Sequence, residues 1–200
     1  MESQNVEPDF SIKLLVLGDL SVGKTSFIYR FIEDKFEIDD ITTTGLDLKT
    51  ADVIIADKKV RVQLWDTAGQ EKYNSITKNL LLRVQGIIIL FDITNKDSFN
   101  NLNLWIKIIN EHCGDKMSMI IVGNKCDLEE NREASKEEIY NYIKKMKKQF
   151  IETSCKTGKN IKKAVDNISK KIINSLSEKK DASFSLDSTC LNQIKKKKCC

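Results

Sequence analysis

A short stretch near the start of the sequence, GDLSVGKT at residues 18–25, combines two glycines with a lysine and a threonine. Its spacing of glycine, four residues, glycine, lysine and threonine is that of a phosphate-binding loop. Glycines let backbone N–H groups turn toward a phosphate, and the N-terminus of a following helix attracts the same charge. Lys24 is expected to reach the β- and γ-phosphates of a nucleotide, and the Thr25 hydroxyl to bind Mg²⁺. The residues expected to border the nucleotide here are Gly18, Asp19, Leu20, Ser21, Val22, Gly23, Lys24, Thr25 and Ser26. A plain glycine-rich turn is the alternative.

Two later tetrapeptides are suited to recognising the base. NKCD at residues 124–127 and TSCK at residues 153–156 each follow an apolar run. The Asp127 carboxylate can accept hydrogen bonds from both N1–H and the 2-amino group of guanine, a donor pair that adenine lacks. Asn124 and Lys125 would brace the base and the loop. In the second tetrapeptide a backbone N–H could reach the guanine O6, and the residues concerned are Ser154, Cys155 and Lys156. Each tetrapeptide alone reads equally as a polar turn, so the prediction depends on their positions after the phosphate loop.

The elements that must hold these motifs alternate between apolar runs and helical periodicity. Strands are predicted at residues 11–18, 46–56, 60–66, 86–93, 117–125 and 150–154, with a hairpin between the second and third through residues 57–59. Helices are predicted at residues 23–36, 98–113, 135–148 and 161–176. This alternation indicates an α/β fold, a doubly wound, mostly parallel six-stranded sheet flanked by helices. Ligands bind at the carboxyl ends of parallel strands, and every motif follows such an end.

Length and composition indicate one domain. The 200 residues are divided into a flexible N-terminus at 1–10, a folded domain at 11–177 and a disordered tail at 178–200. The net charge of +4 owes much to the four lysines at 195–198, so nucleic-acid binding is not expected. No apolar run reaches the roughly 18 residues of a membrane span, the polar N-terminus does not resemble a secretory signal, and the six cysteines include no zinc-site pair.

In this order the motifs resemble those of the Ras superfamily of GTPases, with its P-loop fold, over about residues 11–177. WDTAGQE at residues 65–71 resembles the third motif of that family. By this resemblance Asp66 holds Mg²⁺ through water, the Gly69 N–H senses the γ-phosphate and Gln70 orients the attacking water. Gln70 and Lys24 are thus the expected catalytic residues.

Two residues, one at the end of the first predicted helix and one after it, match residues of the family's first switch region. Thr43 matches the threonine that binds Mg²⁺ and the γ-phosphate, which makes Thr25, Thr43 and Asp66 the expected metal ligands. Phe36 matches the aromatic residue that packs on guanine. A core position that closes the first helix is the alternative for Phe36.

Within the superfamily the chain is most similar to Rab proteins, whose segments are matched by TGLDL, RVQLWDTAGQE, EKYNSIT and ILFDIT. The resemblance implies a monomeric switch in vesicle trafficking that hydrolyses GTP to GDP and phosphate with Mg²⁺ as cofactor. It also implies an exchange factor, an activating protein, an escort or dissociation inhibitor, a prenyltransferase and effectors as partners.

The final two residues match a Rab prenylation signal. Geranylgeranyl groups on Cys199 and Cys200, helped by the preceding lysines, would anchor the protein to the cytosolic face of an endomembrane and let it cycle with the cytosol. A basic, disordered end that happens to finish in cysteine is the alternative.

The chain departs from the Rab pattern at several positions. Leu48, Trp65 and Leu80 stand where an aromatic trio usually forms the effector surface, and only the tryptophan is kept. Asp40 replaces an aromatic residue that often covers the γ-phosphate. Leu20 is expected to project toward the γ-phosphate, where a bulky side chain hinders hydrolysis. A nucleotide-dependent adaptor with negligible hydrolysis is therefore the alternative function, which GTP turnover would distinguish. A P-loop kinase is disfavoured by NKCD and by the lack of an arginine-rich lid.

Overall fold

The computed structural model describes residues 7–36, 46–67, 79–114 and 117–195, with the side chains of the last helix described as far as Glu178. Six strands form one sheet in the order β2-β3-β1-β4-β5-β6. Every neighbouring pair is parallel except β2 and β3, which are antiparallel. The strands are β1 (Phe10–Gly18), β2 (Leu46–Ile55), β3 (Lys58–Thr67), β4 (Gly86–Asp92), β5 (Ser118–Asn124) and β6 (Gln149–Glu152). The predicted fold class is confirmed.

The neighbouring strands β1, β4 and β5 are mostly apolar because helices cover both faces of the sheet there. All seven residues of β4 are buried, and β5 is buried throughout except at its first residue. Such unbroken burial is expected of parallel strands inside an α/β layer arrangement. Each of β1, β4 and β5 ends in a small or polar residue, respectively Gly18, Asp92 and Asn124. Because β1, β4 and β5 are neighbouring parallel strands, these three ends meet at one edge of the sheet.

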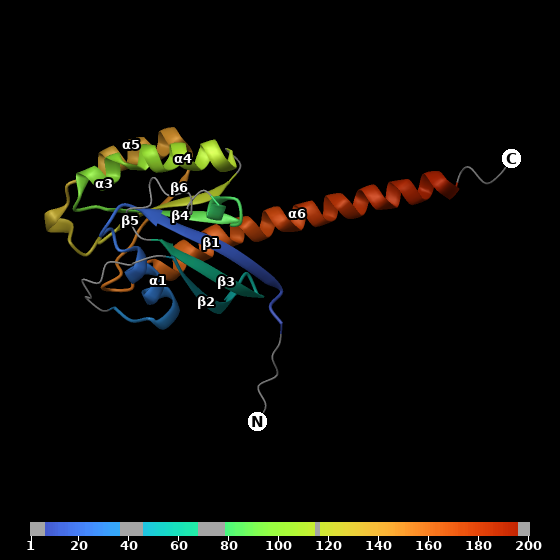
Figure 1. The fold of residues 1–200 in the computed structure, drawn as a ribbon, viewed down its shortest axis with the longest axis horizontal. Helices are drawn as coiled ribbons and strands as arrows, with labels where there is room; N and C mark the ends of the chain where they lie inside the picture. Colours follow the sequence, from blue (N-terminus) through green and yellow to red (C-terminus); the bar gives the residue numbers. More distant parts are fainter. Residues whose placement is uncertain (1–6, 37–45, 68–78, 115–116, 196–200) are drawn as a thin grey trace, which may run out of the picture.

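Helices pack in two layers, one on each face of the sheet (Figure 1). Helices α1 (Lys24–Glu33) and α6 (Ile161–Lys195) cover one face, and α3 (Lys96–Asn100), α4 (Leu102–Cys113) and α5 (Lys136–Met146) cover the other. Alternate residues of β1 point into the two cores, with Leu14 in the first and Leu15 in the second. A short 3-10 helix, η2 (Glu129–Asn131), follows β5.

Two local predictions need correction. The predicted helix at 98–113 is two helices, α3 and α4, which meet at Asn101. This residue is the C-cap of α3 and the N-cap of α4, and its side chain bonds to Asp19. The β2–β3 hairpin turns at Ala56 and Asp57 instead of at residues 57–59, since Ile55 pairs directly with Lys58. Both turn residues have positive φ, 51° and 59°, as a two-residue turn matched to the strand twist requires.

The described structure also differs from the expected boundaries at both ends. The Asp9 N–H donates to the Lys59 carbonyl at 2.8 Å and its carboxylate accepts from the Lys59 N–H at 2.7 Å, so ordered pairing begins before residue 11. At the other end α6 runs on to Lys195, where the sequence predicts a disordered tail. No glycine or proline interrupts residues 178–195, so nothing in this segment forces the helix to stop.

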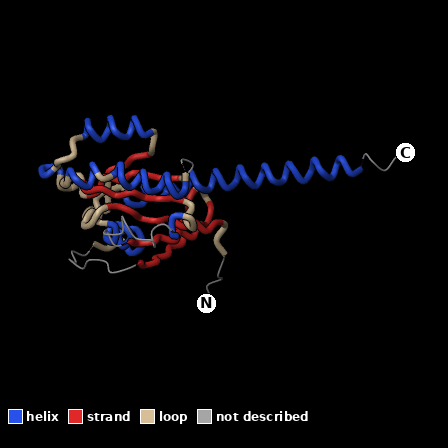
Figure 2. Tube along the Cα trace, turned by 45° about the horizontal axis from the view of Figure 1, so that its top comes forward, coloured by secondary structure: helices blue, strands red, loops and turns tan. Residues whose placement is uncertain are grey.

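Helix α6 has a packed part and a projecting part. Ile172 and Ile173 are its last buried apolar residues and Leu176 is partly buried, within the span whose side chains are described. Beyond them the helix leaves the sheet and extends away from the domain (Figures 1 and 2). No helix in the described part of the chain is long and apolar enough to cross a membrane.

Candidate functional site

The loop between β1 and α1 can be built only with glycine at two positions. Gly18 and Gly23 have φ values of 146° and 94°, which side-chain-bearing residues rarely adopt. A Cβ on Gly18 would lie 2.2 Å from the Leu90 carbonyl oxygen, and one on Gly23 would lie 2.5 Å from the Asn124 amide nitrogen. The first glycine lets the loop pass close to β4, and the second lets it pass close to the end of β5.

Lys24 begins α1 and its side chain is 6% exposed. Its ammonium donates to the carbonyls of Gly18 and Asp19, at 3.1 and 2.9 Å. The loop therefore curls around its own lysine and holds a buried positive charge at its centre. Burying a charge is costly unless it is paired, and phosphate oxygens are the partners that a loop of this shape accepts.

Thr25 and Asp66 come together although they are on different elements. The Thr25 hydroxyl donates to the Asp66 carboxylate at 2.7 Å, and Asp66 is 3% exposed. A hydroxyl and one carboxylate are oxygen ligands of the kind Mg²⁺ takes when phosphates and water complete its shell. Elsewhere in the described part of the chain, no group of three or more histidines, cysteines or carboxylates could hold a metal. The predicted ligands Thr25 and Asp66 thus fit a magnesium site.

Asp19, in the phosphate loop, forms hydrogen bonds with residues at the start of α4. Its carboxylate accepts hydrogen bonds from the Asn101 amide at 2.5 Å and from the Trp105 indole at 2.8 Å. Helical spacing identifies Trp105 only as a core residue, and it is indeed buried, but its polar N–H has this second role. Asp19 thus fixes the loop to the start of α4, next to Leu20.

Asn124 joins the phosphate loop to both base-recognition loops. Its amide nitrogen donates to the Val22 carbonyl at 2.9 Å. Its amide oxygen accepts from the Thr153 hydroxyl at 3.2 Å and from the Cys155 thiol at 3.4 Å. Asn124 and Thr153 are fully buried, and buried hydrogen bonds contribute about 1 kcal/mol each. The three predicted motifs therefore meet around one side chain.

Lys125 and Asp127 face different surroundings. The Lys125 ammonium pairs with the Asp92 carboxylate at 2.6 Å, so Asp92 at the end of β4 braces the NKCD loop. Sequence reasoning missed Asp92, although a carboxylate ending a fully apolar strand is a signal that could have found it. The Asp127 side chain is exposed at the rim of the site. An exposed carboxylate beside braced neighbours is available to a base.

Cys155 is buried under the second base-recognition loop. Burial raises the pKa of its thiol to about 11, so it stays protonated at neutral pH and can donate to Asn124. Ser154, beside it, is fully buried, and its hydroxyl accepts from the Thr157 N–H at 3.1 Å. The loop is thus fixed by its own side chains before any ligand binds.

Arg132 forms ion pairs with residues adjacent to both base-recognition loops. Its guanidinium contacts Glu152, at the end of β6, at 2.9 Å and Glu129, in η2, at 2.7 Å. Lys136 adds a 2.7 Å contact to Glu129, and the hydrogen bonds from Arg132 and Lys136 hold the pKa of Glu129 at about 2. Glu129 follows the NKCD loop and Glu152 precedes the TSCK loop. The network of ion pairs therefore connects the end of the NKCD loop to the start of the TSCK loop.

Comparison with known proteins identifies the family. A model of the Ras family matches residues 13–174. The chain belongs to the Ras family. Ras-related protein Rab-8B of Homo sapiens is 38% identical over 177 residues, which cover 88% of this chain and 86% of the relative. Ras-related protein Rab-10 of Diplobatis ommata is 37% identical over 193 residues, covering 96% of each chain. GTP-binding protein YPTM1 of Zea mays is 41% identical over 158 residues, covering 79% of this chain and 76% of the relative. The chain is a Rab-type GTPase, a GTP hydrolase of this family.

Some predicted site residues of this Rab-type GTPase fall outside the described residues. They are Asp40, Thr43, Gly69, Gln70, Cys199 and Cys200. Phe36 is described, is partly buried and packs against the core cluster that includes residues of α1. Leu20 is 45% exposed at the surface of the phosphate loop. Ser26 lies on α1, directly after the phosphate loop, and Lys156 is the last residue of the TSCK loop.

The residues at the Rab effector positions are separated into two environments. Leu48 on β2 lies directly opposite Trp65 on β3, and Leu48 is 42% exposed. Leu80 is buried in the second core. The Rab-type GTPase therefore presents an aliphatic surface at Leu48, while Leu80 contributes to packing.

Proposed function

We propose that this Rab-type GTPase is a GTP- and GDP-binding switch in vesicle trafficking that hydrolyses GTP and is anchored to a membrane by its C-terminus. The observation that supports this most is the meeting of the phosphate loop and both base loops around Asn124. A site that binds only phosphate would have no need for the NKCD and TSCK loops. Family membership supports the switch role.

The residues of the site would share the work as follows. Lys24 and the loop N–H groups would stabilise the charge that develops on the transferring phosphoryl group. Thr25 and Asp66, with Thr43 by family resemblance, would hold Mg²⁺, which when bound neutralises charge on the β- and γ-phosphates. Gln70 would orient the attacking water. Loss of the γ-phosphate would release Thr43 and Gly69, so that the switch segments relax and effectors dissociate.

A Thr25→Asn variant tests the magnesium role. Because the longer asparagine amide does not replace the threonine hydroxyl as a ligand, the variant should bind GTP at least about tenfold more weakly, with GDP much less affected, since the charge that Mg²⁺ would neutralise is larger in GTP. Equilibrium binding of both nucleotides, with and without Mg²⁺, gives the two ratios. Thr50→Asn, at an exposed threonine on β2, is the matched control. A Thr25→Asn protein with wild-type GTP affinity would remove Thr25 from the ligand set, and wild-type protein that prefers ATP would contradict the proposed function.

The C-terminal cysteines are proposed as the lipid attachment sites. Replacing Cys199 and Cys200 with serine should shift the protein from membranes to the cytosol. Stable anchoring needs two lipid chains or an equivalent second signal, and the variant would carry no lipid chain. Fractionation of cells that express the variant measures the shift, and GTP affinity should be unchanged. Cys190→Ser, in the same segment, is the control and should remain on membranes. Continued pelleting of the double variant with membranes would contradict the anchor.

The alternative of an adaptor without hydrolysis is disfavoured by membership of a family of GTP hydrolases. What we propose instead is a slow intrinsic rate. We further propose an exchange factor, an activating protein, an escort or dissociation inhibitor, a prenyltransferase and effectors as partners. The protein would act as a monomer at the cytosolic face of an endomembrane and cycle with the cytosol.

A further inference from the structure

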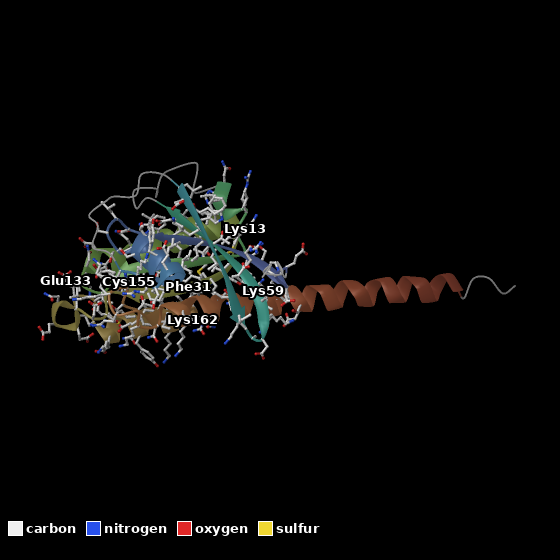
Figure 3. All side chains as sticks on the ribbon, turned by 90° about the horizontal axis from the view of Figure 1, so that it is seen from below. Lys13, Phe31, Lys59, Glu133, Cys155 and Lys162 are labelled. Atoms are coloured by element: carbon white, nitrogen blue, oxygen red, sulfur yellow. The ribbon has the colours of Figure 1, made fainter. Side chains whose placement is uncertain are left out.

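Arg30, on the second half of α1, makes four hydrogen bonds. Its guanidinium donates through Nε to the Cys155 carbonyl and through Nη2 to the Lys156 carbonyl, both at 2.7 Å. Through Nη1 it donates to the carbonyl and the carboxylate of Asp34, at 2.7 and 3.2 Å. The arginine side chain is 14% exposed, and its bond to the Cys155 carbonyl is partly buried, whereas the Asp34 side chain is 92% exposed. In Figure 3 Cys155 is labelled beside α1, near Phe31.

The two long-range bonds fix the orientation of the backbone in the TSCK loop. A carbonyl and the next residue's N–H belong to one planar peptide unit and point in opposite directions. Holding the Cys155 carbonyl therefore turns the Lys156 N–H away from Arg30. A planar guanidinium presents its donors as a rigid fork, which suits two neighbouring carbonyls better than a flexible ammonium does.

The other half of the same loop is held from a different side. Asn124 accepts from Thr153 and from the Cys155 thiol, while Arg30 holds the backbone at Cys155 and Lys156. Helix α1 itself begins with Lys24 and Thr25 of the phosphate loop. Arg30 is thus a direct connection, along one helix, between the element that holds phosphate and the loop predicted to read the guanine O6.

We propose that Arg30 is a positioning residue for base recognition, which aims the backbone N–H groups of the TSCK loop at the C6 substituent of guanine. This proposal rests on the proposed function, because it needs a guanine nucleotide in the site. It predicts a selective effect: discrimination at C6 depends on Arg30, whereas discrimination at C2, made by the Asp127 carboxylate, does not.

Two GDP analogues separate these contacts. 6-Thio-GDP replaces O6 with sulfur, a weak acceptor, and keeps N1–H and the 2-amino group, whereas IDP lacks only the 2-amino group. In Arg30→Met, which keeps the apolar stem without donors, the preference for GDP over 6-thio-GDP should shrink about three- to tenfold, the effect of one weakened hydrogen bond. The preference for GDP over IDP should stay within about twofold of wild type. Competition binding at pH 7 gives both ratios.

Two further variants make the result decisive. Arg30→Lys should give an intermediate loss at C6, and the same comparison is made with it if Arg30→Met does not fold. Asp34→Ala removes the side-chain partner of Arg30 Nη1 without touching the loop, and both ratios should match wild type. Unchanged C6 discrimination in both Arg30 variants, or a parallel loss at C6 and C2, would overturn the proposal. Failure of wild type to bind GDP would contradict the proposed function instead.

Discussion

An Asp127→Asn variant is expected to change base preference from guanine to xanthine by about 1000-fold, measured as the ratio of GDP to XDP affinity. The carboxylate offers acceptors to both N1–H and the 2-amino group, and hydrogen bonds to charged groups contribute about 1.5–3 kcal/mol each. An asparagine amide offers one acceptor and one donor. Xanthine carries a carbonyl at C2 in place of the amino group, so the amide pairs with it and fits guanine poorly.

The surroundings of Asp127 indicate that this substitution changes base recognition without disturbing the rest of the site. Its side chain is exposed, while the neighbours that hold the loop, Asn124 and Lys125, are bonded to other parts of the site. The substitution should therefore leave the fold and the phosphate contacts intact. Glu130→Gln, which removes another exposed carboxylate just after the loop, is the matched control and should keep the preference for GDP. Equal GDP and XDP affinities in wild type would exclude Asp127 as the selector.

The positions of the motifs could be predicted because each depends on local sequence and on one rule of sheet topology. Glycines at 18 and 23 are required by the backbone itself, and apolar runs ending in polar residues place Asp66 and Asn124 at the same sheet edge. Asp66 was predicted as a magnesium ligand beside Thr25 by the resemblance to the Ras superfamily, and the structure brings the two side chains to 2.7 Å.

The residues that hold the loops were not predictable in the same way. Arg30 reads as an exposed helix residue and Trp105 as core, since their partners lie far away in the sequence. A contact between such residues depends on the packed arrangement of whole elements, to which periodicity gives no access. At the junction of α3 and α4, the bond from the Asn101 side chain to Asp19 of the phosphate loop is a contact of the same kind.

The limits of the domain were also hard to predict, for a different reason. Hydrophobic periodicity ends near Leu176, and so does the buried stripe of α6, yet the helix continues to Lys195. Periodicity reports which residues face a core, and it is silent about a helix that projects beyond one. The sequence predicts a disordered tail from residue 178, whereas the described backbone is helical as far as Lys195.

A Leu20→Ser or Leu20→Gly variant is expected to hydrolyse GTP faster than wild type, by up to about 100-fold, the cost that a misplacement of about 1 Å can impose on a reacting geometry. Leu20 is 45% exposed on the phosphate loop and stands next to Asp19, whose carboxylate is bonded to Asn101 and Trp105. Because Asp19 is fixed to α4, the loop cannot easily swing the leucine aside. The side chain would then compete for space with Gln70 and with an arginine supplied by an activating protein.

Binding and hydrolysis should respond differently to this change. Nucleotide affinity depends on backbone N–H groups and Lys24, so it should stay close to wild type in both Leu20 variants. Single-turnover hydrolysis, with and without an activating protein, measures the rate. Ile54→Ser, which removes an exposed apolar side chain at the far end of β2, is the control for general surface effects. Serine and glycine should act alike if bulk is the cause, and a gain with glycine alone would point to loop flexibility. Unchanged rates in both variants under both conditions would mean that the leucine is accommodated in the transition state and that the slow rate has another origin.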